Sequence, residues 1–256
     1  SPIFLLTGRK RDAFHLKNIT VQPGKKWSGE LELANGDIRL PATVLHGHGT
    51  GKTMLITAGV HAGEYVGIQA AIELSQKLKI EKVNGTIIIV KVMNRPAFEA
   101  RNGSMGLDDG KNLNREFPGN PDGTEMERLA WAISQELQPA ADYYIDLHSG
   151  DDYEKLIPYV YYAGAAAGEV VSLSRQMAEQ VDVPYMVKSN VASGGSYNYA
   201  ASQGIPSILI ERGGMGDWTY EEVRSTRRDV RNILCHMGIY QGLKDFRTYY
   251  PLDVAD

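Results

Sequence analysis

The sequence predicts an α/β fold, in which layers of helices cover a largely parallel sheet. After Lys52, short apolar runs alternate with longer stretches of helical periodicity. At 256 residues, the chain is long enough to bury a large core. Hydrophobic residues make up 43% of the chain and charged residues 23%, which is ordinary usage for a globular enzyme.

The N-terminal part has a different pattern. From Asn18 to His46, polar and apolar residues alternate, and Pro23-Gly24 and Asn35-Gly36 mark turns. We therefore expect antiparallel β structure there. The predicted organisation is a β-rich extension over residues 1–48 packed on a catalytic domain over residues 49–256, with one single domain as the alternative.

The rest of the chain yields the elements of the layered fold. Buried strands are predicted at 53–59, 86–92, 142–147, 158–163 and 207–210. Helices are predicted at about 63–79, 124–138, 167–181 and 219–237. The second and fourth helices open with capping boxes, Thr124 with Glu127 and Thr219 with Glu222, which satisfy free amide donors at a helix start.

Two segments between these elements need an interpretation. Residues 95–122 are rich in Gly, Asn and Asp and lack periodicity, which is typical of a functional loop. The segment 47–53, GHGTGKT, lacks the first glycine of a phosphate loop and precedes a strand, so we interpret it as a hairpin turn. His46 and His48 beside it have no third metal ligand within reach, and a packed or solvated role is expected.

Charge and cysteine content limit the classes of partner. The net charge is −4, and the densest basic cluster, Arg224 to Arg228, lies in a helical pattern with acidic neighbours, so we expect a solvated face and no nucleic-acid partner. No apolar run is long enough to span a membrane. The single cysteine, Cys235, favours a reducing compartment and hence a cytoplasmic location, with a signal peptide upstream of Ser1 as the alternative.

Three polar residues come directly after buried apolar runs. These residues are His61, His148 and Glu211. Because ligands bind outside the carboxyl ends of the strands in open α/β sheets, all three can converge in one crevice.

His61, Glu64 and His148 together predict a metal site. His61 and Glu64 are three residues apart at a helix start and can point the same way. With His148 they form a His₂Glu set, which leaves the fourth position of tetrahedral zinc open for water. The sequence therefore predicts one catalytic Zn²⁺ per chain.

Five motifs in order make the chain resemble the zinc carboxypeptidase superfamily, and within it the succinylglutamate desuccinylase/aspartoacylase branch. They are AGVHAGEYVG (58–67), DGKNLNREFPG (109–119), DLHSG (146–150), SGGSYNYA (193–200) and IPSILIERGG (205–214). The resemblance implies a three-layer α/β/α fold with a mixed, largely parallel sheet. It also implies an amidohydrolase that removes the acyl group from a small N-acyl amino acid.

The resemblance further implies individual roles. Glu211 matches the carboxylate that activates water and returns a proton to the leaving amine. Asn114 and Arg115 match the pair that holds the substrate carboxylate. Arg101 matches the arginine that polarises the scissile carbonyl, with Arg95 as the competitor.

Departures from the peptide-cleaving relatives keep other readings open. Asn190 stands where those relatives carry a tyrosine, and Tyr197 would shorten the specificity pocket, so a small or acidic substrate is expected. A carboxypeptidase for short or modified peptides is the first alternative, and a catalytically inactive binding module is the second. Asp146 is either an acceptor behind a ligand imidazole or a structural carboxylate.

Overall fold

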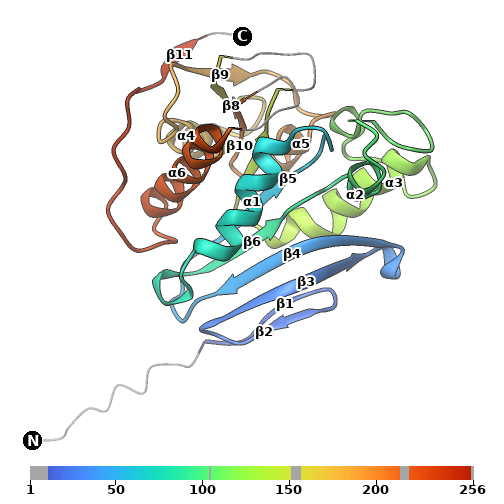
Figure 1. Cartoon of the computed structure of the whole chain (residues 1–256), viewed down its shortest axis with the longest axis horizontal. Coiled ribbons are helices and arrows are strands. Elements are labelled where there is room, and N and C mark those ends of the chain that lie inside the picture. Colours follow the sequence, from blue (N-terminus) through green and yellow to red (C-terminus); the bar gives the residue numbers. More distant parts are fainter. Residues whose placement is uncertain (1–10, 104, 151–156, 214–218, 255–256) are drawn as a thin grey trace, which may run out of the picture.

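The computed structural model describes residues 11–103, 105–150, 157–213 and 219–254. These residues form a nine-stranded sheet between two layers of helices, and a two-stranded sheet packs beside it (Figure 1). The strands are β1 (Phe14–Leu16), β2 (Ile19–Val21), β3 (Lys25–Leu33), β4 (Ile38–His46), β5 (Thr53–Ala58), β6 (Thr86–Val90), β7 (Tyr143–His148), β8 (Tyr159–Ala163), β9 (Tyr185–Ser189), β10 (Ser207–Glu211) and β11 (Leu252–Val254). The helices are α1 (Tyr65–Lys77), α2 (Arg95–Glu99), α3 (Glu125–Ala132), α4 (Gly168–Ala178), α5 (Ser196–Ser202) and α6 (Tyr220–His236).

The large sheet is mixed and mostly parallel, as predicted. Its strand order is β11-β9-β8-β10-β7-β5-β6-β4-β3. Parallel pairs join β11 to β9, β9 to β8, β10 to β7, β7 to β5 and β5 to β6, while β8–β10, β6–β4 and β4–β3 are antiparallel. β5, β7 and β10 are parallel neighbours in the middle of the sheet, so their carboxyl ends lie side by side.

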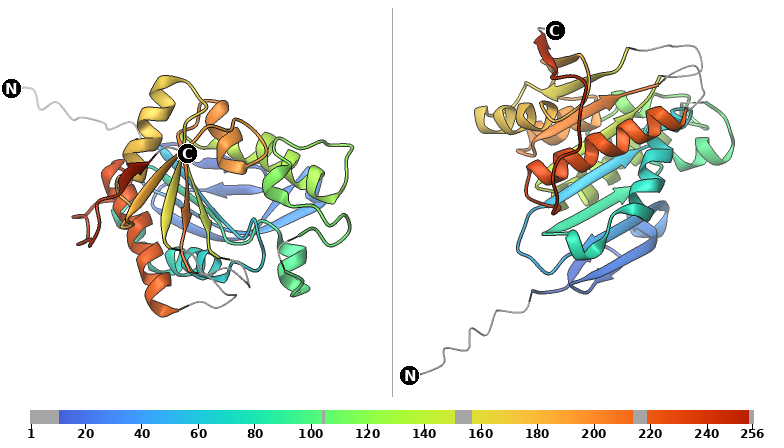
Figure 2. Two further views of the ribbon diagram at one scale, coloured as in Figure 1. Left: turned by 90° about the horizontal axis from the view of Figure 1, so that it is seen from above. Right: turned by 60° about the vertical axis from the view of Figure 1, so that its left-hand side comes forward.

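The hydrophobic core is divided between the two faces of this sheet. Along β5, Met54 and Ile56 belong to the cluster under α1 and α6, whereas Leu55 belongs to the cluster under α3 and α5. Seen from above, α1 and α6 lie on one side of the twisted sheet and α3 and α5 on the other (Figure 2). This alternation follows from the period of two in strand side chains, and it explains why the central strands are continuously apolar.

The N-terminal residues contribute to both sheets. β1 and β2 form the separate two-stranded sheet, while β3 and β4 extend the large sheet through the pairing of β4 with β6. A short N-terminal β segment is thus present. The division into an extension and a catalytic domain stays a prediction.

The helix starts predicted at Thr124 and Thr219 are confirmed, since these residues cap helices that begin at Glu125 and Tyr220, and the capping box at Thr124 forms completely. At α6, the Thr219 side chain accepts from the Glu222 amide at 3.2 Å. The helix predicted over 124–138 is α-helical only to Ala132 and continues as a π turn over Ile133–Leu137. Pro139 follows this turn, and it cannot donate the amide hydrogen bond that a longer α-helix would need.

The hairpin turn predicted at residues 47–53 is wrong. β4 and β5 are not neighbours, because β6 lies between them and pairs with both. The segment instead crosses the end of β6, where Gly47 donates its amide hydrogen to the Gly85 carbonyl at 2.8 Å. His46 is packed as expected, since its ring nitrogens lie 2.8 Å from Thr86 Oγ1 and 2.8 Å from the Asp12 carbonyl.

Strand β9, strand β11 and helix α5 were not predicted. α5 begins within the SGGSYNYA motif, whose glycines and serines are weak helix formers. Over the described ranges, the structure has no helix with the length and apolar character needed to cross a membrane.

Candidate metal centre and active site

Two of the expected site residues end neighbouring strands. His148 is the last residue of β7 and Glu211 is the last residue of β10, and the parallel register places the two directly opposite each other. Partners in a parallel register point to the same face of the sheet. The structure therefore brings Glu211 beside His148, as the sequence predicted.

His61 and Glu64 reach the same place from the turn between β5 and α1. Gly59, just after β5, has a positive φ of 69°, which turns the chain out of the sheet. The Glu64 amide donates to the His61 carbonyl at 3.2 Å, so the two ligands share one tight turn before the helix. α1 itself lies very close to β7, because a Cβ atom at Gly67 would be 2.9 Å from the Leu147 carbonyl oxygen.

The three predicted ligands converge. One donor atom from each of His61, Glu64 and His148 lies within 4.8 Å of the others. Nδ1 of His61 is 3.0 Å from Oε1 of Glu64, and Nδ1 of His148 is 3.0 Å from Oε2 of the same carboxylate. The side chain of His148 is 1% exposed and that of Glu64 is 6% exposed, so water cannot separate these groups freely.

Hydrogen-bond acceptors behind the rings of His148 and His61 determine the tautomer of each ring. Nε2 of His148 lies 2.7 Å from Oδ2 of Asp146, and Nε2 of His61 lies 2.7 Å from Oδ1 of Asn112. Because both partners are acceptors, each Nε2 carries a hydrogen and donates it, which leaves each Nδ1 lone pair facing Glu64. Asp146 is therefore an acceptor behind the imidazole of a predicted ligand, which favours the first of its two predicted roles.

This arrangement fits a metal ion. Two nitrogen lone pairs and two carboxylate oxygens facing one another in a buried space repel unless a cation lies among them. Burial opposes a charged His148, but without a metal ion the charges of Asp146 and Glu64 outweigh burial and raise the pKa of His148 well above its usual value. A proton on Nδ1 then takes the place that the ion would have beside Glu64. Burial likewise opposes ionisation of Glu64, yet His148 and His61 lower the pKa of Glu64 to about 2. A His₂Glu set of this kind suits zinc.

Asp146 is held by a buried chain of hydroxyl groups. Oγ1 of Thr57 donates to Oδ1 of Asp146 at 2.7 Å and lies 2.6 Å from the hydroxyl of Tyr144. The Tyr144 hydroxyl lies 2.7 Å from Oγ of Ser196. Since the single hydrogen of Thr57 goes to the carboxylate, Tyr144 must donate to Thr57 and Ser196 to Tyr144. This directional chain fixes the orientation of Asp146 and, through it, of His148.

Two motifs that are distant in sequence meet next to the metal centre. Phe117 and Gly194 exchange backbone hydrogen bonds of 3.0 and 2.8 Å, which joins NLNREFPG to SGGSYNYA. Oδ1 of Asn114 accepts from the Ser196 amide at 3.0 Å. The loop with Asn114 and Arg115, which is predicted to bind the substrate carboxylate, is therefore tied to the start of α5 and to the hydroxyl chain.

The expected substrate-binding residues differ in exposure. Asn114 is 7% exposed, and Arg115 is exposed and donates from Nη1 to the Asn114 carbonyl at 3.1 Å. Within the described ranges, no carboxylate pairs with Arg115, so its guanidinium can bind an anionic group. Tyr197 is 4% exposed and packs in the cluster with Phe117 and Leu209, so its role at the pocket stays a prediction.

The two candidate arginines for the scissile carbonyl have different surroundings. Arg95 donates to Glu30 at 2.7 Å and to Glu99 at 2.8 Å, which keeps it on the β3 side of α2. Arg101 is exposed just after α2, with a positive φ of 52°, and its side chain bonds to no other described residue. These surroundings favour Arg101.

Sequence reasoning missed Asn112. Its Oδ1 accepts from His61 Nε2 and also from the Asn114 amide at 2.9 Å, so one oxygen links a predicted metal ligand to the loop predicted to bind the substrate carboxylate. The signal was present in the NLNR motif, whose first asparagine precedes a short 3-10 turn that it caps.

Comparisons with known proteins agree with this geometry. Residues 50–237 match the model of the succinylglutamate desuccinylase/aspartoacylase catalytic domain. The chain is 36% identical over 219 residues to the N-alpha-acetyl-L-2,4-diaminobutyric acid deacetylase of Halomonas elongata. The match covers 82% of this chain and 62% of that enzyme, so the chain spans less than two thirds of the length of this relative.

Solved structures that are similar to this chain include members of the same family. The product-bound ectoine utilization protein EutE (DoeB) of Ruegeria pomeroyi superposes with a TM-score of 0.81 at 30% identity, over 96% of this chain and 74% of that one. A succinylglutamate desuccinylase from Silicibacter sp. TM1040 has a TM-score of 0.78 at 29% identity, over 96% of this chain and 72% of that one.

Proposed function

The chain belongs to the succinylglutamate desuccinylase/aspartoacylase catalytic-domain family, and we propose that it is a zinc-dependent amidohydrolase that deacylates a small N-acyl amino acid. The observation that carries the proposal is the position of Glu211. It lies beside His148 at the carboxyl ends of β10 and β7, next to a buried His₂Glu set. A carboxylate base next to a metal site is the pairing that amide hydrolysis requires.

His61, Glu64 and His148 would hold one zinc ion per chain. When bound, zinc polarises a carbonyl and lowers the pKa of water to about 7, which makes hydroxide available at neutral pH. The acceptors Asp146 and Asn112 keep both imidazoles in the tautomer that presents Nδ1 to the ion.

Other residues of the chain bind the substrate and move protons. Glu211 takes a proton from the attacking water and delivers it to the amine as the C–N bond breaks. Arg115 and Asn114 hold the carboxylate of the substrate, because a guanidinium offers a planar pair of donors to it. Arg101 donates to the oxygen on which negative charge develops.

The substrate class follows from the family and the site. We propose an N-acyl amino acid with a short acyl group, and an N-acetylated diamino acid is the first candidate because the 36% identical relative deacetylates N-alpha-acetyl-L-2,4-diaminobutyric acid. The exposed Arg115 supports a free carboxylate on the substrate. The proposed partner is this small molecule, with neither nucleic acid nor a membrane.

The proposal is tested by amine release from a panel of substrates. Zinc-loaded protein should hydrolyse N-acetyl or N-succinyl amino acids, including N-alpha-acetyl-2,4-diaminobutyrate, and should lose activity with a chelator. Turnover of dipeptides alone would support the carboxypeptidase reading instead. Failure to bind zinc or hydrolyse any amide would support an inactive binding module.

We also propose a cytoplasmic location, on the basis of the single cysteine, Cys235. Fractionation of cells that express the gene at its natural level tests it, and recovery from an oxidising compartment would contradict it.

A further inference from the structure

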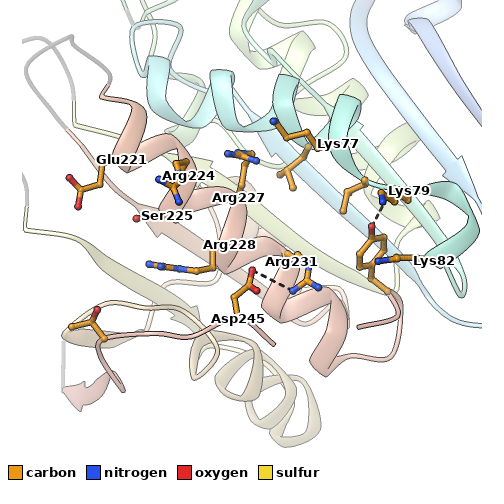
Figure 3. Close-up of a pocket in the computed structure, with 14 residues that line it drawn as sticks. Lys77, Lys79, Lys82, Glu221, Arg224, Ser225, Arg227, Arg228, Arg231 and Asp245 are labelled. Atoms are coloured by element: carbon orange, nitrogen blue, oxygen red, sulfur yellow. Dashed lines mark hydrogen bonds and ion pairs between the residues drawn. The ribbon is translucent and has the colours of Figure 1, made fainter. Parts of the chain in front are cut away.

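A large basic pocket lies between the end of α1 and the outer face of α6, apart from the metal centre. Its volume is about 700 Å³. Seven of its lining residues are cationic, and they come from three segments: Lys77 on α1, Lys79 and Lys82 after α1, and Arg224, Arg227, Arg228 and Arg231 on α6. Figure 3 shows these side chains along both walls of the pocket.

The charge of this pocket is opposite to that of the whole chain. Two acidic residues, Glu221 and Asp245, also line it, so the lining carries a net charge of 7 − 2 = +5. The complete protein carries −4. Concentrating cations in this way raises the potential inside a recess and attracts anions to it.

The arginines are arranged in a row. Arg224, Arg227, Arg228 and Arg231 are three or four residues apart on α6, which places them on one face of the helix. From Arg224 to Arg231 the row extends roughly 10 Å along the helix axis. Lys79 and Lys82 lie toward one end of the pocket, and Arg224 lies toward the other (Figure 3).

Internal ion pairs leave much of this charge uncompensated. Three of the seven cations form ion pairs within the described ranges: Arg227 with Glu73 at 3.4 Å, Arg228 with Asp182 at 2.8 Å and Arg231 with Asp245 at 3.4 Å. The side chains of Lys77, Lys79 and Lys82 pair with no carboxylate among the described residues.

Two buried donors argue against a simple solvated face. Nε of Arg227 lies 3.4 Å from Oε1 of Glu73 without forming a hydrogen bond, and Nε of Arg228 is also buried without one. Buried guanidinium donors that lack acceptors cost free energy, and the charge attraction of an anion bound to the row would offset part of that cost.

We propose that this pocket binds an elongated small molecule that carries two or more phosphoryl or sulfo groups. One anionic group would contact Lys79 and Lys82, and another would contact the arginine row near Arg224. The site is independent of the metal centre, since none of its lining residues is a ligand or substrate-binding residue.

The test uses a fluorescent pyrene trisulfonate dye, because sulfonates are poor zinc ligands and do not report on the metal centre. The full chain should bind the dye with one-to-one stoichiometry in fluorescence polarisation. The variant Lys79→Gln/Lys82→Gln should bind it about tenfold more weakly, as expected for lost charge-assisted contacts. Its melting temperature should be unchanged, because neither side chain pairs with a carboxylate among the described residues.

The matched control is Lys25→Gln/Lys52→Gln, which removes two exposed cations outside the pocket. It should bind the dye as the wild type does. Equal weakening in both variants would mean nonspecific attraction and would overturn the proposal, as would undiminished binding in Lys79→Gln/Lys82→Gln. Salt-sensitive self-association that this variant abolishes, seen by sedimentation without dye binding, would assign the pocket to a second copy and also overturn it.

Discussion

Oδ1 of Asn112 lies 2.7 Å from Nε2 of His61, and the same oxygen accepts from the amide of Asn114. The other ligand imidazole, His148, donates to a carboxylate, Asp146. One of the two proposed metal-binding histidines is therefore supported by a neutral amide and the other by an anion. An anionic acceptor makes an imidazole a stronger ligand, so His61 is the more weakly supported of the two.

Replacing Asn112 should change metal affinity in a direction that depends on the new acceptor. Asn112→Ala removes the partner of His61 and should weaken zinc binding by about 10- to 100-fold. Asn112→Asp keeps an acceptor and adds charge, so it should bind zinc at least as tightly as wild type. Competition with a chelating dye measures both, and equal affinities for the two variants would contradict the role assigned to Asn112.

Glu211 should be needed for turnover and not for metal binding. Glu211→Gln keeps the size of the side chain but removes the proton acceptor, so the rate should fall by about 10² to 10⁴ while zinc content stays normal. His148→Ala should lose the metal instead. Metal analysis beside amine-release kinetics separates the two variants, and a zinc-free Glu211→Gln protein would show that the base is assigned wrongly.

Arg101 and Arg95 should differ in their effect on activity. Arg101→Ala removes a donor for the developing negative charge, so kcat should fall by about 10² to 10³. Arg95 already pairs with Glu30 and Glu99, so Arg95→Ala should leave kcat nearly unchanged. The reverse order of kcat values would assign the carbonyl to Arg95.

Arg115 should recognise the carboxylate of the substrate. Arg115→Met should lower kcat/KM for an N-acetyl amino acid by about 10- to 100-fold, the value of one or two hydrogen bonds to a charged group. The matching carboxamide should be hydrolysed equally by wild type and variant. Arg128→Met, an exposed change on α3, serves as the control and should affect neither substrate. A loss of the same size on both substrates would rule out carboxylate recognition by Arg115.

A buried ion pair behind Glu211 should be important for stability. Nε of Arg212 donates to Oδ2 of Asp229 at 2.7 Å, and both side chains are buried. Asp229→Asn removes the only carboxylate that is hydrogen-bonded to Arg212 among the described residues and leaves Glu222 at 4.0 Å, so the free energy of unfolding should fall by about 3 to 5 kcal/mol. Asp245→Asn breaks the exposed pair with Arg231 and should cost about 0 to 1 kcal/mol. Urea denaturation measures both, and equal losses would contradict the importance of burial.

The elements that could be predicted from sequence are those with local signals. Apolar runs identified β5, β6, β7, β8 and β10, and capping residues identified the starts of α3 and α6. The short helix α5 and the strands β9 and β11 escaped because few residues define each of them, and glycines and serines obscure the start of α5. The order of β4, β6 and β5 could not be predicted either, because the pairing of strands that are distant in sequence produces no periodic pattern in the sequence.

For the site, the sequence was sufficient to predict that His61, His148 and Glu211 converge, because each follows an apolar run and parallel strands bring their carboxyl ends together. Glu64 was predicted from its spacing of three residues from His61. It could not assign Asn112 to His61, the hydroxyl chain from Thr57 to Ser196, or the pairing of Phe117 with Gly194. Nor could it show that the cations around Arg224 to Arg228 face those of Lys79 and Lys82 across one pocket. These contacts join segments more than 50 residues apart in the sequence. A hydrogen bond between them requires side chains placed to within a few tenths of an ångström, and only the packing of the whole chain determines that placement.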